Sequence, residues 1–229
     1  MNADARLDRL NVDPPRGGRG PRTNLTRARG QRTREIILEE ATVLFSKYGY
    51  RGTSLRDISE RVGISHPGML HHFSHKEALL LAVLDRTADQ LDEFVDAFVS
   101  TAQDPAELVN WDAVKFHDSH MFSVVRAEAL EESHPGRGRI IEMQLTAEHK
   151  LADLFTVYAE RGWLADGVSP DWMARVAVGM WTGLYIRDGL LNDDRVLPDI
   201  AQFFAMCIVP LRDPRLLAAL TASAGASAP

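Results

Sequence analysis

A polar side chain between small residues opens a short predicted helix, an arrangement that could donate hydrogen bonds into a groove. The segment from Thr53 to Glu77 contains His66, followed by Pro67 and Gly68, which offer almost no hydrogen-bonding side chain. The major groove of DNA admits a helix, and its base edges present hydrogen-bond donors and acceptors. These residue types make His66 the candidate base reader, with Pro67 and Gly68 contributing shape.

Two short helices that meet at Gly63 are predicted to position this turn. Apolar residues recur at helical spacing over residues 55–62, and Ser54 offers an oxygen to cap the first helix. Gly63 can adopt the left-handed conformation that ends such a helix. Ser65 can cap the second helix, where Pro67 lies in the first turn and needs no backbone donor. Two helices joined in this way predict a helix-turn-helix, whose second helix enters the major groove.

The residues around this motif resemble a known family. The string GYRGTSLRDISERVGISHPGMLHHFSHKEALLLAVL, from Gly49 to Leu84, is similar to the DNA-binding domain of tetracycline-repressor (TetR) family transcriptional regulators. The resemblance covers residues 31–84 and implies an all-α fold with a larger helical domain after the motif. The matching residues are Gly49, Tyr50, Thr53, Ser54, Ile58, Gly63, Ser65, Phe73 and the run from Lys76 to Leu79.

The resemblance also implies how the motif meets DNA. We expect His66, Pro67 and Gly68 to face bases. Leu70 departs from the tyrosine common in the family, so a hydroxyl contact to a phosphate is missing, which His71 and His72 partly replace. The expected phosphate contacts are Ser54, Arg56, His72 and Lys76. The last two long helices are expected to form a four-helix interface in a homodimer, because two recognition helices related by a two-fold axis read a palindromic operator.

The net charge of −6 conceals a division between the two parts of the 229-residue chain. Residues 1–78 carry a net charge of +5 and the remainder −11. Phosphate binding requires a locally positive surface, and the acidic remainder would be kept away from the duplex. An acidic protein can therefore bind double-stranded DNA.

The composition changes along the chain predict four segments. Residues 1–30 form a disordered basic arm, 31–76 the helix-turn-helix domain, 77–222 a ligand-binding and dimerisation domain, and 223–229 a disordered tail. The arm either enters the adjacent minor groove or only adds nonspecific attraction. Within residues 31–48 we expect Ile36, Ile37, Ala41, Leu44, Phe45 and Tyr48 to be buried. A capping box at residues 74–77 begins a connecting helix of about 25 residues, long enough to transmit a tilt.

The second domain carries the candidates for a small-molecule site. Arg126 and Glu128 lie in an apolar context, which suggests either paired charges or a place for an anion. Plain core packing is the alternative for each apolar candidate. The candidate ligand-binding residues are Trp111, Phe116, His120, Phe122, Arg126, Met143 and Trp181.

Other chemistries have weaker support. His117 and His120 share a helical face, but no third metal ligand follows from spacing, so we expect no metal or cofactor. Cys207 is the lone cysteine and is expected to be buried, with redox sensing as the alternative.

No phosphate-binding glycine loop or nucleophile elbow is present, so we expect no enzyme. No apolar run approaches the roughly 20 residues of a membrane span, and the N-terminus lacks a signal-peptide core, which predicts a cytoplasmic chain.

We therefore expect an all-α, homodimeric DNA-binding regulator, a repressor that a small-molecule effector releases from its operator. An activator, or a DNA-binding protein without a ligand, shares the same N-terminal half. A helical enzyme or metal-binding protein is the third alternative.

Overall fold

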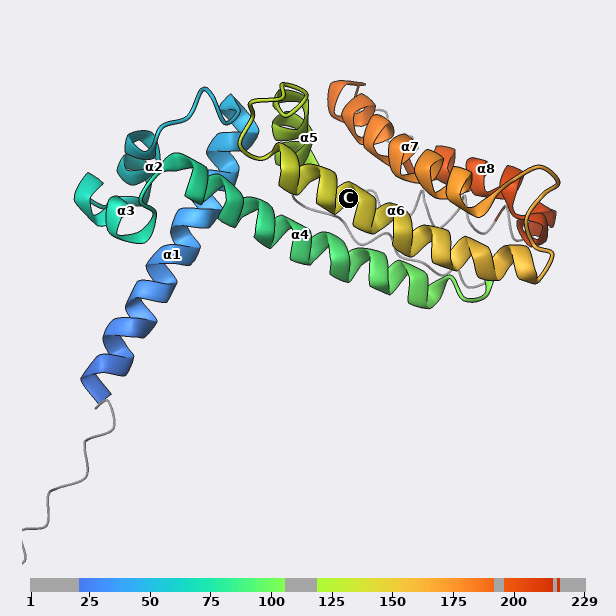
Figure 1. Ribbon diagram of the computed structural model, residues 1–229, viewed down its shortest axis with the longest axis horizontal. Helices are drawn as coiled ribbons and strands as arrows, with labels where there is room; N and C mark the ends of the chain where they lie inside the picture. Colours follow the sequence, from blue (N-terminus) through green and yellow to red (C-terminus); the bar gives the residue numbers. More distant parts are fainter. Residues whose placement is uncertain (1–20, 106–118, 192–195, 216–217, 219–229) are drawn as a thin grey trace, which may run out of the picture.

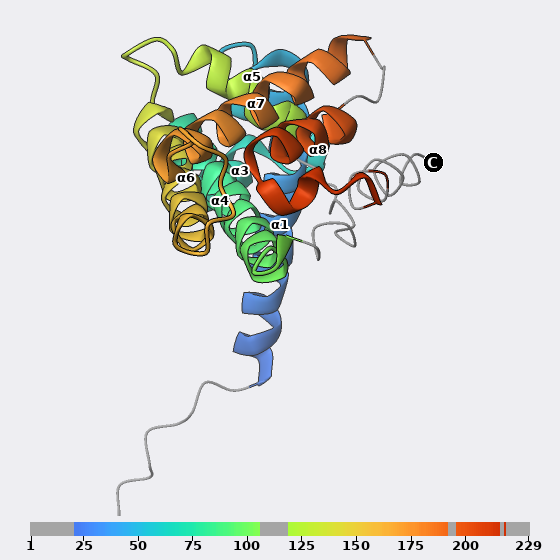
Figure 2. The same cartoon turned by 90° about the vertical axis from the view of Figure 1, so that its right-hand side faces the viewer.

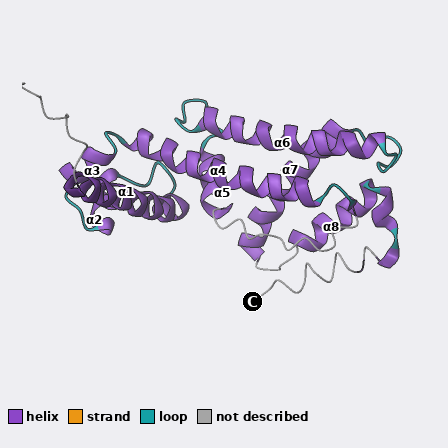
Figure 3. Cartoon of the chain, turned by 90° about the horizontal axis from the view of Figure 1, so that it is seen from below, coloured by secondary structure: helices purple, strands orange, loops and turns teal. Residues whose placement is uncertain are grey.

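The computed structural model describes residues 21–105, 119–191, 196–215 and 218 (Figure 1). Within these ranges the chain is helical and no strand is formed, which confirms the all-α prediction (Figure 3). No helix in the described ranges is long and apolar enough to cross a membrane. The helices are α1 (Pro21–Tyr48), α2 (Leu55–Val62), α3 (His66–His72), α4 (Lys76–Thr101), α5 (Ser119–Glu128), α6 (Arg137–Glu160), α7 (Pro170–Leu191) and α8 (Val196–Cys207), followed by the 3₁₀ helix η2 (Val209–Arg212).

Helix α1 is longer than predicted. It begins at Pro21, ten residues before the expected start, so the prediction of disorder is wrong for residues 21–30. Proline is favoured at the first helical position because its fixed φ suits the helix and its missing N–H has no partner there. The N-terminal half of α1 projects beyond the other helices (Figure 1). The rest of the predicted arm, residues 1–20, and the predicted tail, residues 223–229, lie outside the described residues.

The buried face of α1 also differs from the prediction. Ile36 and Tyr48 are 39% and 53% exposed, whereas Leu38, which was not predicted, is buried. Ile37 and Phe45 are fully buried as expected. The buried stripe is set by where α2, α4 and α5 contact the helix and not by apolar spacing alone.

The helix-turn-helix forms as its capping residues predict. The Ser54 hydroxyl accepts a hydrogen bond from the Asp57 amide at 3.2 Å, and the Asp57 carboxylate accepts one from the Ser54 amide at 2.9 Å. Gly63 ends α2 with φ 77°, a left-handed backbone conformation that residues other than glycine rarely adopt. Ser65 caps α3 by accepting from the Gly68 amide at 3.2 Å. The motif therefore has both of its helices capped by its own side chains.

Helix α4 runs from the motif into the larger bundle (Figure 1). Its N-cap is His75, whose Nδ1 accepts a hydrogen bond from the Ala78 amide at 3.1 Å, so the predicted capping box led by Ser74 is wrong. The imidazole takes the N-cap role expected of the Ser74 hydroxyl, one residue later, and binds the Ala78 amide instead of the Glu77 amide. At 26 residues the helix has the predicted length.

Two apolar clusters lie along α4. The first joins α1, α2 and α3 to the start of α4, and it also includes Met121 and Val125 of α5. The second lies among the end of α4, α6, α7 and α8 (Figure 2). Around this cluster α4 packs on α6, α6 on α7, and α7 on α8. Cys207 is buried in this second cluster. The division at residues 76 and 77 stays a prediction, but α5 shares its core with the helices before that division.

A carboxylate joins α5 to the loop between α1 and α2. Glu128 accepts hydrogen bonds from the amides of Tyr50 at 2.7 Å and Arg51 at 3.2 Å. Gly49 precedes these amides with φ 72°, and a Cβ on it would lie 2.6 Å from the Glu128 Oε1. Successive backbone N–H groups beside a left-handed residue form a concavity that binds anions. Arg51 also pairs with Glu131. We call this set of contacts the α5 clamp.

Tyr50 and His134 complete the α5 clamp. The Lys76 Nζ lies 4.2 Å from the centroid of the Tyr50 ring, and the His134 ring meets Tyr50 edge-on at 5.2 Å. His134 is buried, and its Nδ1 accepts from the Gly136 amide at 3.2 Å. Its Nε2 has no hydrogen-bond partner among the described residues. Burial is the main cause that lowers the pKa of His134; Arg51 adds to this, whereas Glu128 and Glu131 oppose it.

His134 should make folding stability depend on pH. Because its folded pKa is lowered, the unfolded chain binds more protons below about pH 6.5, the ordinary histidine pKa. The stability is fully present above that pH and is lost as the pH falls toward the folded pKa. We expect His134→Asn, whose amide oxygen can accept from Gly136, to flatten this slope, which is at most about 1.4 kcal/mol per pH unit. Urea unfolding between about pH 7.5 and pH 5.5 measures it. The matched control is His149→Asn on the exposed side of α6, and equal slopes in both variants would contradict the assignment.

Candidate nucleic-acid interface and interior pocket

The exposed face of α3 carries the predicted base reader. His66 and Pro67 are exposed, whereas Met69 and Phe73 are buried on the opposite side. Leu70 is 41% exposed and lies on the same face as His66, one turn further along. In so short a helix, the pair Met69 and Phe73 already defines the buried side, and that spacing could have revealed Leu70 as a surface residue.

Basic side chains lie together at the end of α3. His71 and His72 have ring centroids 5.8 Å apart, and the Arg34 guanidinium lies 4.5 Å from the centroid of the Phe73 ring. Partial burial lowers the pKa of His72, and the nearby positive charges of His71 and Arg34 lower it further. A phosphate beside these groups would relieve that repulsion. Arg34 was not among the predicted contacts, because its proximity to α3 depends on how α1 crosses the motif.

The other predicted phosphate contacts differ in how available they are. Arg56 is exposed and makes one surface ion pair with Glu60 at 3.2 Å. Ser54 is exposed, but its hydroxyl belongs to the α2 cap. Lys76 donates hydrogen bonds to the backbone carbonyls of Tyr50 at 2.9 Å and Thr53 at 3.0 Å. Two of its three donors are therefore used within the chain, and we reassign Lys76 from a phosphate contact to a residue that holds α4 against the loop before α2.

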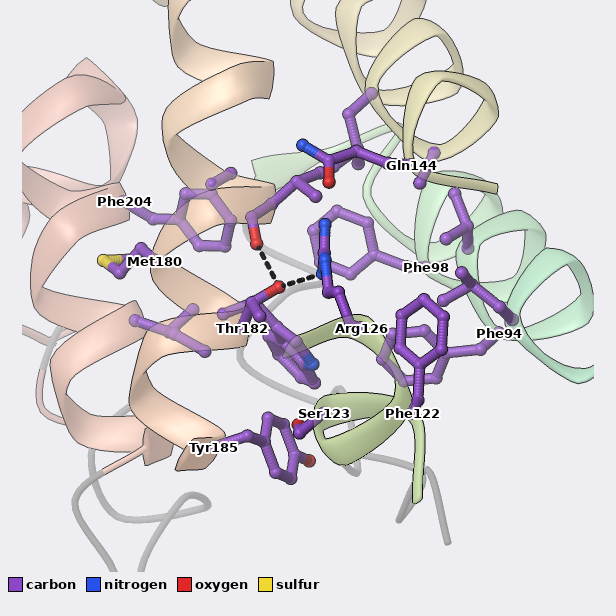
Figure 4. Close-up of a pocket in the computed structure, with 18 residues that line it drawn as sticks. Phe94, Phe98, Phe122, Ser123, Arg126, Gln144, Met180, Thr182, Tyr185 and Phe204 are labelled. Carbon is purple, nitrogen blue, oxygen red and sulfur yellow. Dashed lines mark hydrogen bonds between the residues drawn. The ribbon is translucent and has the colours of Figure 1, made fainter. Parts of the chain in front are cut away.

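A pocket of about 110 Å³, counted as space open to the centres of water molecules, lies between α4, α5, α6, α7 and α8 (Figure 4). Three predicted ligand-binding residues, Phe122, Arg126 and Trp181, line it. Sequence reasoning missed its other aromatic walls, chiefly Phe94, Phe98, Tyr185 and Phe204, and the polar Ser123, Gln144 and Thr182.

The remaining predicted ligand-binding residues do not line this pocket. Met143 is buried at 4% exposure and is not part of the wall of this pocket. It lies on the stripe of α6 that packs into the core. Trp111, Phe116 and His117 fall outside the described residues, as does the side chain of His120, although its backbone lies in α5. Within the described residues, no group of three or more histidine, cysteine or acidic side chains could hold a metal.

One face of α7 is left uncovered by the part of the chain that the structure describes. Ile186 is 45% exposed and Leu190 is 77% exposed. Gly179 and Gly183 lie on the same face at helical spacing, and a Cβ on either would meet no described atom within 4 Å. We call these four residues the α7 stripe. Its composition fits the close approach of another helix.

Comparisons with known proteins agree with this architecture. The family model "Bacterial regulatory proteins, tetR family" matches residues 37–83. The HTH-type transcriptional repressor AcnR of Corynebacterium diphtheriae is 30% identical over 141 residues, which are 60% of this chain and 71% of AcnR. The chain belongs to the TetR family of bacterial regulatory proteins. It is a DNA-binding transcriptional regulator.

Other relatives share parts or the fold of this TetR-family chain. The HTH-type transcriptional activator FasR of Mycolicibacterium smegmatis is 34% identical over 60% of each chain. Further curated regulators match over only 27% and 31% of their own lengths. The crystal structure of a regulator from Saccharomonospora viridis in complex with choline has a TM-score of 0.65 at 19% identity, covering 78% of this chain and 98% of that one. These relatives are named as regulators and not as enzymes.

Because Lys76 is assigned a structural role and Arg56 a phosphate contact, substitutions of the two residues should have different effects. Arg56→Ala should weaken DNA binding and reduce the slope of log affinity against log salt by about 0.9, the value for one lost phosphate contact. Lys76→Met should instead lower the free energy of unfolding by about 1–3 kcal/mol, because two carbonyls lose their donor. Its salt slope should remain that of the parent chain. Fluorescence anisotropy across a salt series and urea unfolding measure the two effects. A slope that drops equally in Lys76→Met would restore Lys76 as a phosphate contact.

Proposed function

We propose that this TetR-family regulator is a homodimeric repressor that leaves a palindromic operator when a small molecule fills the pocket. The observation that carries the proposal is the position of two side chains on α5. Arg126 lies in the pocket, and Glu128, two residues later, accepts hydrogen bonds from the loop that leads into α2. Residues two apart on a helix point about 200° apart, so α5 contacts the pocket with one side and the DNA-binding domain with the other.

This arrangement provides a physical path for control. A molecule that contacts Arg126 displaces or holds α5, and the carboxylate of Glu128 carries that movement to the amides of Tyr50 and Arg51. The same loop receives Lys76 from α4, so both connecting helices end on it. A ligand can shift the equilibrium only by its preference for one arrangement of this loop over the other.

On DNA, the exposed face of α3 supplies the reading surface. His66 offers a donor or acceptor to a base edge, and Leu70 offers an apolar contact of the kind that the thymine methyl group makes. Ser65, Pro67 and Gly68 form the tight first turn that enters the groove. Arg34, Arg56, His71 and His72 surround that face with groups suited to phosphate contact.

The proposed sign of regulation follows the name of AcnR, a repressor, whereas FasR is named an activator. Genome-wide mapping of bound sites tests both the operator and the sign. Palindromic sites that overlap promoters, with increased transcription when the regulator is deleted, support repression. Decreased transcription of the same genes would overturn it.

Glu128→Gln should uncouple the pocket from DNA. One amide oxygen cannot replace both carboxylate oxygens, so the loop loses part of its connection to α5. We expect pocket affinity to be retained, while the ratio of operator affinities with and without ligand falls from the 5- to 150-fold typical of allosteric coupling toward about one. Operator anisotropy titrations with and without ligand measure the ratio. Glu132→Gln, an exposed neighbour, is the matched control, and an unchanged ratio in Glu128→Gln would contradict this path.

Ile186→Glu should disrupt the homodimer. A charge on the α7 stripe would be buried against the symmetry-related helix, where an unpaired carboxylate is strongly disfavoured. We expect a shift to monomer in analytical ultracentrifugation and loss of binding to a two-half-site operator. The control is Ile141→Glu on α6, because Ile141 is 46% exposed, nearly the same as Ile186. A dimer that persists in Ile186→Glu would place the interface elsewhere.

A further inference from the structure

The charge of the pocket comes from one arginine. Among the described residues that line it, Arg126 is the charged one, and no described carboxylate is part of the wall. Aromatic and aliphatic side chains make up most of the remaining surface, with Ser123, Gln144, Thr182 and the hydroxyl of Tyr185 as the polar exceptions (Figure 4). An apolar cavity with one fixed cation selects ligands by charge as well as by shape.

The Arg126 guanidinium is held in place but not neutralised. Its Nη1 donates to the Thr182 hydroxyl at 2.8 Å, and that hydroxyl donates to the Val178 carbonyl at 3.0 Å. The guanidinium also lies 5.4 Å from the centroid of the Phe122 ring. Within the described part of the chain, Arg126 forms no ion pair. Glu148 is close enough to raise the pKa of Arg126, but its carboxylate accepts a hydrogen bond from Gln144, and burial lowers that pKa more strongly.

A half-buried arginine without an ion-pair partner is costly, because water solvates it poorly and Glu148 compensates its charge only in part, without forming an ion pair. An anion entering the pocket removes that cost and gains charge-assisted hydrogen bonds. A guanidinium fork matches a carboxylate with two parallel N–H donors. A phosphate dianion would leave an excess negative charge among aromatic rings, whereas one carboxylate balances one guanidinium.

We propose that the pocket binds a carboxylate carrying an apolar chain, with the carboxylate on Arg126 and the chain among Phe94, Phe98, Trp181 and Phe204. This inference rests on the proposed function, in which the same pocket is the effector site. The pocket volume of about 110 Å³ is several times the roughly 30 Å³ that one water occupies in the liquid, so the pocket has room for an apolar chain. Octanoate, a medium-chain fatty carboxylate, is the probe for this class.

Isothermal titration of the full chain with octanoate, 1-octanol and n-octylamine tests the charge preference. The three probes share one apolar chain and differ in the charge of the head group. We expect octanoate to bind about ten-fold or more tightly than 1-octanol, as for a charge-assisted hydrogen bond, and n-octylamine to bind most weakly. Binding of 1-octanol or n-octylamine as tight as that of octanoate would overturn the proposal.

Substitutions of Arg126 test whether this residue causes the preference for octanoate over 1-octanol. Arg126→Met keeps much of the side-chain volume and should abolish the advantage of octanoate over 1-octanol, whereas Arg126→Lys should retain part of it. Arg161→Met, at the exposed end of α6, is the matched control and should keep the full advantage. Retention of the advantage in Arg126→Met would overturn the assignment.

Thermal melting followed by circular dichroism would detect misfolding of Arg126→Met. A further variant tests the proposal independently in that case. Thr182→Val preserves the shape of its side chain but removes the acceptor that orients the guanidinium. Octanoate affinity should fall several-fold, and 1-octanol affinity should stay the same. Equal affinities for octanoate in Thr182→Val and the parent chain would overturn the orienting role and the proposed pose with it.

An operator-release assay with the same probes distinguishes this inference from the proposed function. If octanoate binds at Arg126 but does not weaken operator binding, the ligand class stands and effector control fails. If 1-octanol releases the operator and octanoate neither binds nor releases it, effector control stands and the ligand class fails.

Discussion

The arrangement of this protein depends on one carboxylate bound by backbone amides. Glu128 ends α5 and accepts from Tyr50 and Arg51, in a loop whose glycine leaves room for it. Hydrogen bonds to an ionised group are among the stronger ones in proteins, and removal of one partner leaves the other unsatisfied. This contact, together with the apolar cluster that α5 shares with α1 and α4, holds the DNA-binding helices against the bundle that contains the pocket.

Tyr50 takes part in several of the contacts that hold this loop. Its amide donates to Glu128, its carbonyl accepts from Lys76, and its ring contacts both Lys76 and His134. A loop held from both α4 and α5 cannot move with one helix alone. The orientation of α3, which follows directly after α2, is thus coupled to two helices that also line the pocket.

The charged groups of the pocket and of the α5 clamp differ in the partners that compensate them. In the α5 clamp, Glu128 is compensated by amides and Arg51 by Glu131. In the pocket, Arg126 has one neutral partner, Thr182, and aromatic neighbours. A protein selected for stability alone would gain from pairing or removing such a cation. A site that must respond to a ligand benefits from an interaction that only the ligand completes.

The local elements were determined by the sequence itself. Ser54, Gly63 and Ser65 specify the ends of α2 and α3 because caps and left-handed glycines act within a few residues of the chain, and the family resemblance relies on the same positions. The all-α class was implied by the same family resemblance. The early start of α1 at Pro21 was missed, because arginine-rich composition suggested disorder while a proline at the first helical position permits a helix.

Only the tertiary structure decided what each long-range contact does. Lys76 lies beside a DNA-binding motif in sequence, yet it donates to carbonyls 23 and 26 residues away. Glu128 reaches amides 77 and 78 residues away, and no spacing rule predicts such a pair. Phe122, Arg126 and Trp181 were recognisable as apolar or charged residues of helices, but their convergence on one pocket, and the exclusion of Met143, depend on how the helices rotate when they pack.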